Sequence, residues 1–122
     1  MENQIKASFD VSTEEGQIRV LNAQAGASQS MKSVEDGKVI PVTAILQYPE
    51  KTDEYGKDQD VLVTTLFTDD GEVFSSISET VASSAGRIMD FMKKFNKEVL
   101  NVKIVKQKSR NGQEFINLQI AM

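Results

Sequence analysis

The sequence contains no cysteine, no histidine and no tryptophan among its 122 residues. Without cysteine it cannot form a disulfide framework, a thiolate zinc site or a thiol nucleophile. Without histidine it lacks the commonest general base and the commonest transition-metal ligand. No apolar run approaches the roughly 20 residues of a membrane span, and the first residues lack the pattern of a signal peptide. We therefore expect one soluble cytoplasmic domain over residues 1–122.

Charged residues are distributed unevenly along the chain. Residues 1–83 hold 6 basic and 15 acidic side chains, whereas residues 84–122 hold 8 basic and 3 acidic ones. Such asymmetry is a hint of a polyanionic partner for the basic part. A basic face that is only solvated is the alternative interpretation.

Alternating apolar residues predict three strand regions before residue 78. The first covers residues 5–24 with a break near Gly16, and the second is the β-branched run 39–48. The third covers residues 60–77 with a turn in its middle. The small polar segment 25–33 and the charged segment 49–60 are typical of loops.

One helix is predicted over residues 78–96. Its apolar positions recur with spacings of four and three residues: Val81, Ala85, Ile88, Met92 and Phe95. Ser76 and Ser78 compete as the N-cap, and Asn96 can end the helix. Gly86 lowers helix propensity, so it suggests close packing against a strand. We assign Phe91 and Phe95 of this helix and the strand residue Phe9 to the core.

Two further strands, 99–108 and 114–121, flank the sequence Asn111-Gly112, a strong hairpin signal. Three strand regions, a helix and a hairpin match the element order of a five-stranded OB-type Greek-key barrel, a mainly β fold with its helix between strands three and four. An open sheet with one packed helix is the alternative.

The acidic pairs in the sequence do not indicate catalytic carboxylates. All four fall in predicted turns or loops, which is typical of solvated carboxylates: Glu14-Glu15, Glu35-Asp36, Asp53-Glu54 and Asp69-Asp70. The segment around Asp69 is too short for a calcium loop, and no glycine-rich phosphate-binding pattern occurs. We expect neither an enzyme nor a cofactor or metal site.

Basic and aromatic residues are interleaved on the predicted strands and loops. Four basic residues lie on or beside the last hairpin: Lys103, Lys106, Lys108 and Arg110. Phe115 stands among outward polar residues, either as a stacking surface or covered by a loop. Tyr48 ends a strand, and Tyr55 lies in the charged segment. Single-stranded nucleic acid is bound by such a combination of cationic groove and stacking aromatics.

Four segments distributed over most of the chain carry a resemblance to a known family. They are VLNAQAGASQSMK (20–32), QYPEKTDEYG (47–56), VTTLFTDDGEVFSSISETVA (63–82) and VKIVKQKSRNGQEFINLQI (102–120). In this order they resemble the small single-stranded DNA-binding proteins of tailed phages that replicate DNA by protein priming.

The resemblance implies a replication protein that coats displaced strands, protects them from nucleases and assists the phage DNA polymerase in the host cytoplasm. It also implies stacking aromatics at Tyr48, Tyr55 and Phe74, where the family's tyrosine at the last position is replaced by phenylalanine. Single-stranded DNA is the expected partner, and the polymerase is a candidate one. The alternative is an acidic phage protein that binds a host protein through the 49–60 loop and does not bind DNA.

Overall fold

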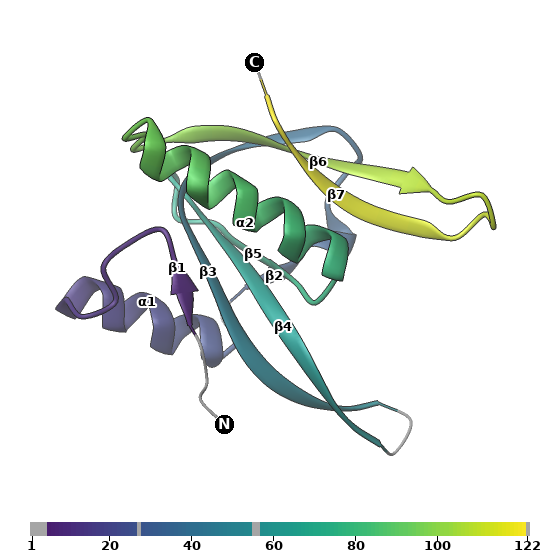
Figure 1. Ribbon diagram of the computed structural model, residues 1–122, viewed down its shortest axis with the longest axis horizontal. Helices are drawn as coiled ribbons and strands as arrows, with labels where there is room; N and C mark the ends of the chain where they lie inside the picture. The colour runs from purple at the N-terminus through teal and green to yellow at the C-terminus, as the bar shows by residue number, and fades with distance from the viewer. Residues whose placement is uncertain (1–4, 27, 55–56, 122) are drawn as a thin grey trace.

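The computed structural model describes residues 5–26, 28–54 and 57–121, with the side chains of 51–59 left out (Figure 1). The strands are β1 (Lys6–Ala7), β2 (Gln29–Ser30), β3 (Lys38–Glu54), β4 (Lys57–Thr68), β5 (Val73–Ser76), β6 (Leu100–Lys108) and β7 (Glu114–Ile120). The helices are α1 (Glu14–Gln24), α2 (Glu79–Lys94) and the short 3-10 helix η1 (Met31–Ser33).

All the strands join one curled sheet in the order β2-β5-β4-β3-β6-β7, with β1 added beside β3 (Figure 1). Strand β3 is the centre, because β4 pairs along one edge while β6 and β1 share the other. Strand β2 is parallel to β5, and the other pairs are antiparallel.

The predicted five-stranded OB-type barrel is therefore wrong. The fold is mixed α/β: the described residues form seven strands and two α-helices, and the end strands β2 and β7 do not pair with each other. The alternative expectation was an open sheet with one packed helix, whereas the structure has an open sheet with two α-helices in the described residues. Separate apolar clusters lie on the two faces of this sheet, one around α2 and one that includes α1 residues. The sheet thus buries both faces without closing into a barrel.

The one helix predicted from the sequence, over residues 78–96, is confirmed as α2. Ser78 is the N-cap, and its hydroxyl accepts a hydrogen bond from the Val81 N–H at 3.3 Å. At the other end Asn96 takes a positive φ of 50°, and the Lys97 N–H donates to the Met92 carbonyl at 2.9 Å. This is a Schellman-type ending. The buried residues of α2 form the larger core with β3 to β7: Val81, Ala85, Ile88, Met89 and Met92.

Residues 14–24 form helix α1 and not the second half of a strand. Thr13 is its N-cap, because its side-chain oxygen accepts from the Gly16 N–H at 3.0 Å. A Cβ on Gly16 would lie 2.1 Å from the Asp10 carbonyl oxygen, so only glycine lets α1 pack this closely on the preceding segment. Buried Val20 and Ala23 attach α1 to the smaller core.

The charged segment predicted as a loop, 49–60, contains two paired strands, 49–54 and 57–60, which we call the arm. Register pairs continue from Glu50 with Val61 to Glu54 with Lys57. Figure 1 shows this arm extending beyond both helices. The predicted loop 25–33 likewise contains β2 and η1. Neither α1 nor α2 is long and apolar enough to cross a membrane, as far as the structure describes the chain.

Candidate nucleic-acid interface

The β6–β7 hairpin brings together five of the eight residues predicted to bind DNA. The turn is tight: the Ser109 N–H donates to the Gln113 carbonyl at 2.9 Å, and Gly112 has a φ of 77°. Lys108 and Arg110 are exposed beside this turn. Phe115 pairs with Gln107 and is half-buried, and it shares a face with Lys103 because side chains alternate along strands.

Lys106 differs from the other basic residues of the hairpin. It has the opposite parity to Lys103 along β6, so the two side chains leave opposite faces of the strand. Its ammonium donates to the Lys32 carbonyl at 3.0 Å, and its backbone N–H donates to the Asp36 carboxylate at 2.8 Å. Lys106 therefore holds η1 and the following turn against β6.

Tyr48 is buried in the smaller core, with 5% of its surface exposed. Its hydroxyl donates to the Ala23 carbonyl at 3.1 Å. Burial, and secondarily the Glu50 carboxylate, raises the pKa of Tyr48. No ring face is left for a base in this position, so we leave Tyr48 out of the interface.

Phe74 is also buried, with 1% of its surface exposed. It belongs to the larger core, and the Lys38 ammonium lies 5.8 Å from its ring centroid. Stacking on Phe74 would require the core to open, so we leave it out as well. Tyr55, the third expected stacking residue, lies outside the described residues.

A groove that the sequence did not predict runs between α2 and the β1 segment. Its volume is about 730 Å³, within the range of ligand-binding clefts. Three cations line it: Lys6 from β1, and Arg87 and Lys93 from α2. Apolar side chains also line it: Ile5, Ala7, Phe9, Val11, Leu62, Ala82 and Met89. The polar residues Gln47, Ser83 and Asp90 lie among them. Cations beside an apolar lining suit a ligand with charged and flat apolar parts.

Two smaller hollows extend the groove along α2. One of about 410 Å³ shares Lys93 and reaches Asn96 and Lys97. The other, of about 370 Å³, shares Arg87 and reaches Asn117 on β7. We call the three together the α2 track. At Asn117 the track meets the strand that carries Phe115, so it joins the new groove to the predicted hairpin.

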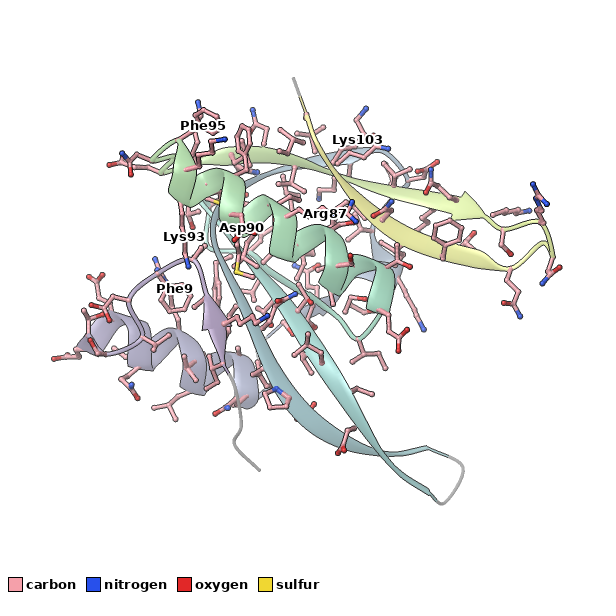
Figure 2. The ribbon with its side chains drawn as sticks, viewed as in Figure 1. Phe9, Arg87, Asp90, Lys93, Phe95 and Lys103 are labelled. Atoms are coloured by element: carbon pink, nitrogen blue, oxygen red, sulfur yellow. The ribbon has the colours of Figure 1, made fainter. Side chains whose placement is uncertain are left out.

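The side chains of Arg87, Asp90 and Lys93 follow one another at intervals of three residues on α2, and Figure 2 shows Lys93 extending toward Phe9. Residues three apart on a helix are neighbours, so Asp90 offsets part of the positive charge. Removing the charge of Asp90 should therefore change the affinity for an anionic ligand in the opposite direction to removing the charge of a lysine.

Phe9 is held in the wall of the groove by several contacts. Its ring meets Phe67 edge to face at 6.1 Å, and the Arg19 guanidinium lies 5.1 Å from its centroid. The next residue, Asp10, accepts hydrogen bonds from the Ser12 hydroxyl and N–H, which lower the pKa of that carboxyl. Phe9 therefore packs on the smaller core, as predicted, and also lines the groove.

Gly86 and Phe95 are placed differently from their predictions. Gly86 lines the groove, and a Cβ there would meet no atom within 4 Å, so it does not mark close packing against a strand. Phe95 is 53% exposed and does not complete the core, because α2 ends at Lys94 and the chain turns at Asn96.

Carboxylates do not gather into a metal site in the part of the chain that the structure describes. The track offers ammonium, guanidinium, amide and aromatic groups, which suit binding, beside the separate carboxylates of Glu79, Asp90 and Glu98. Residues 1–121 match the family described as phage single-stranded DNA-binding protein. This chain belongs to that family. The family is one of binding proteins and not of enzymes, in agreement with the expectation from the sequence.

Several single-stranded DNA-binding proteins are similar to this chain over nearly its full length. That of Bacillus phage B103 is 46% identical over 118 residues, covering 97% of each chain. Those of Bacillus phages PZA and phi29 are each 42% identical over 120 residues, covering 98% of this chain and 97% of theirs. No solved structure matches.

The α2 track was missed because its residues have no common pattern in the sequence. Lys6, Phe9 and Lys93 come from segments more than 80 residues apart, which only the folded chain brings together. One signal was present: the excess of basic residues in 84–122 includes the cations of α2 as well as those of the hairpin.

Proposed function

We propose that this chain binds single-stranded DNA with little sequence preference, along the α2 track and the β6–β7 hairpin. The family match over residues 1–121 is the observation that carries the proposal. It also favours DNA binding over the alternative of an acidic protein that acts only through the arm.

The chemistry of the track supports a single strand as the ligand. Lys93, Arg87 and Lys97 supply charge for phosphates, and the apolar side chains of the groove suit the faces of bases. Duplex DNA keeps its bases stacked inside the helix, so it cannot use the apolar lining. Stacking accepts every base, which explains a weak dependence on sequence.

In the phage, such a protein coats the strands displaced during DNA replication in the host cytoplasm and shields them from nucleases. Non-specific binding suits that role, since the displaced strand exposes the whole genome sequence. The phage DNA polymerase is the partner that this coating assists. Coated strands do not re-anneal ahead of the polymerase, so strand displacement becomes easier.

A titration with oligo-dT and with duplex DNA at several salt concentrations tests the proposal. For about 2–4 phosphate contacts, the slope of log K against log salt is expected near −1.5 to −3, with about −0.7 for each contact. Equal affinity for duplex, or a slope near zero, would contradict it.

Two variants with opposite expected effects on affinity test whether the strand lies in the groove. Lys93→Gln is expected to weaken binding and to reduce the slope by about 0.7, because one phosphate contact is lost. Asp90→Asn removes a neighbouring negative charge and is expected to strengthen binding. A folding defect would weaken both. Lys32→Gln removes a charge from η1 outside the track and serves as the control.

A further inference from the structure

The end of α2 presents an aromatic ring to solvent. Phe95 is the C-cap residue and is 53% exposed, although it follows the apolar stripe of the helix in the sequence. Its backbone N–H donates to the Phe91 carbonyl at 3.1 Å, and the Schellman-type ending after it fixes the direction of the chain. The position of the ring is therefore set by the helix and does not depend on a loop.

Two neighbours define the surroundings of this ring. The Phe91 ring lies 4.8 Å away between centroids, tilted by 49°, and Phe91 itself packs on the larger core. The Lys94 ammonium lies 5.5 Å from the Phe95 centroid. Lys94 is exposed, and an exposed cation–aromatic contact is weak, so it can yield to a stronger one.

Phe95 does not line the α2 track itself but directly precedes the residues at one end of it. The next two residues, Asn96 and Lys97, line the hollow at that end, and Lys93 links the hollow to the main groove. Figure 2 places Phe95 and Lys93 on opposite sides of the C-terminal end of α2. A base stacked on Phe95 requires the strand to leave the groove past Lys97 and to turn around the helix end.

We propose that Phe95 is a stacking platform for a base of single-stranded DNA at this end of the track, with Lys94 and Lys97 binding the adjacent phosphates. The proposal rests on the proposed function. When a base stacks on the ring, the Lys94 ammonium moves from the ring face to a phosphate. The two basic residues also compensate the negative end of the α2 dipole, which would otherwise repel the strand.

Fluorescence can test the contact directly, because the chain contains no tryptophan. In Phe95→Trp, the emission of the single indole is expected to be quenched as oligo-dT is added, through stacking with a base. Leu21→Trp is the matched control. Leu21 is 62% exposed on α1, whereas α2 covers the other face of the sheet, so its indole is expected to keep its emission.

Affinity measurements complete the test. Phe95→Ala is expected to weaken oligo-dT binding by roughly 5- to 150-fold, with the salt slope unchanged because no cation is lost. Phe95→Tyr is expected to retain the affinity, and the melting temperature of each variant should stay near that of the parent, since the ring is mostly exposed.

Two results would overturn the stacking platform while leaving the proposed function intact. They are oligo-dT binding by Phe95→Trp without quenching, and parental affinity in Phe95→Ala. Failure of the parent protein to bind oligo-dT at all would instead refute the proposed function, and the platform with it.

Discussion

The Tyr48 hydroxyl donates a hydrogen bond to the Ala23 carbonyl, 3.1 Å away, and so ties β3 to the last turn of α1. Carbonyls in the last turn of a helix lack partners within the helix, and here the Gly26 N–H and Tyr48 both supply one. An aromatic residue that the sequence suggests as a base-stacking group thus acts in the structure as a link between helix and sheet.

Tyr48→Phe is expected to lower the free energy of unfolding by about 0.5–1.5 kcal/mol, the usual net value of one hydrogen bond. The ring would still fill the core, so oligo-dT affinity should not change. Denaturant unfolding and an oligo-dT titration check the two halves of this prediction. Weaker DNA binding at unchanged stability would show instead that the hydroxyl contacts DNA.

Alkaline pH is expected to destabilise the protein partly through Tyr48. Burial raises the pKa of this phenol in the folded state, with a smaller contribution from Glu50. A raised pKa favours the neutral form, so the stabilisation is complete below the unfolded pKa of about 10 and is lost as the pH rises through the folded value. The parent should therefore lose stability more steeply than Tyr48→Phe as the pH rises above about 10. Parallel curves would exclude this linkage.

Gly86 provides a test of the groove that leaves charge unchanged. A Cβ at this position meets open space, so Gly86→Ala is expected to raise the free energy of unfolding by about 0.5–1 kcal/mol through helix propensity. Gly86→Leu should also fold, but its side chain would project into the groove and weaken oligo-dT binding. If Gly86→Leu binds as tightly as Gly86→Ala, the strand does not occupy the groove at this point.

Gly16 is the opposite case. A Cβ there would lie 2.1 Å from the Asp10 carbonyl oxygen and 2.9 Å from the Val11 Cα, so the backbone must shift. Gly16→Ala is expected to destabilise the protein by about 1–3 kcal/mol, the range for overpacking, despite its better helix propensity. A gain in thermal stability would mean that α1 packs less closely on this segment than the structure shows.

Local sequence signals predicted α2 and the β6–β7 hairpin well, because each is defined by its own periodicity and its own turn or cap residues. They failed for α1, where only Gly16, Val20 and Ala23 are buried while Ile18 and Leu21 are exposed. Such a narrow buried stripe is easily confused with strand alternation. The N-cap Thr13 with two glutamates after it was the available signal.

The strand pairing of the arm and the burial of Tyr48 and Phe74 could not be predicted for a different reason. Residues 49–54 and 57–60 extend beyond both helices, so this strand pairing persists without the apolar alternation that burial would impose (Figure 1). The register of β3, β4 and β5 places Tyr48 and Phe74 on opposite faces of the sheet, and alternation in the sequence does not reveal that each face is covered. Only knowledge of both helices shows that neither ring reaches solvent.

The tip of the β6–β7 hairpin should bind phosphates independently of the groove. Lys108 and Arg110 are exposed there, so replacing both with glutamine should leave the melting temperature unchanged. The loss of two phosphate contacts is expected to reduce the salt slope of oligo-dT binding by about 1.4 and to weaken binding at low salt.

Lys106→Gln is the control for this prediction, since it removes one positive charge from the same hairpin, whereas the double variant removes two. Its ammonium already donates to the Lys32 carbonyl from the opposite face to Lys103, so it is not expected to contact the strand. The slope should therefore stay near the parental value in Lys106→Gln and fall in the Lys108→Gln, Arg110→Gln double variant. If the slope in Lys106→Gln falls by half as much as in the double variant, the hairpin acts only through its total charge and not through contacts at its tip.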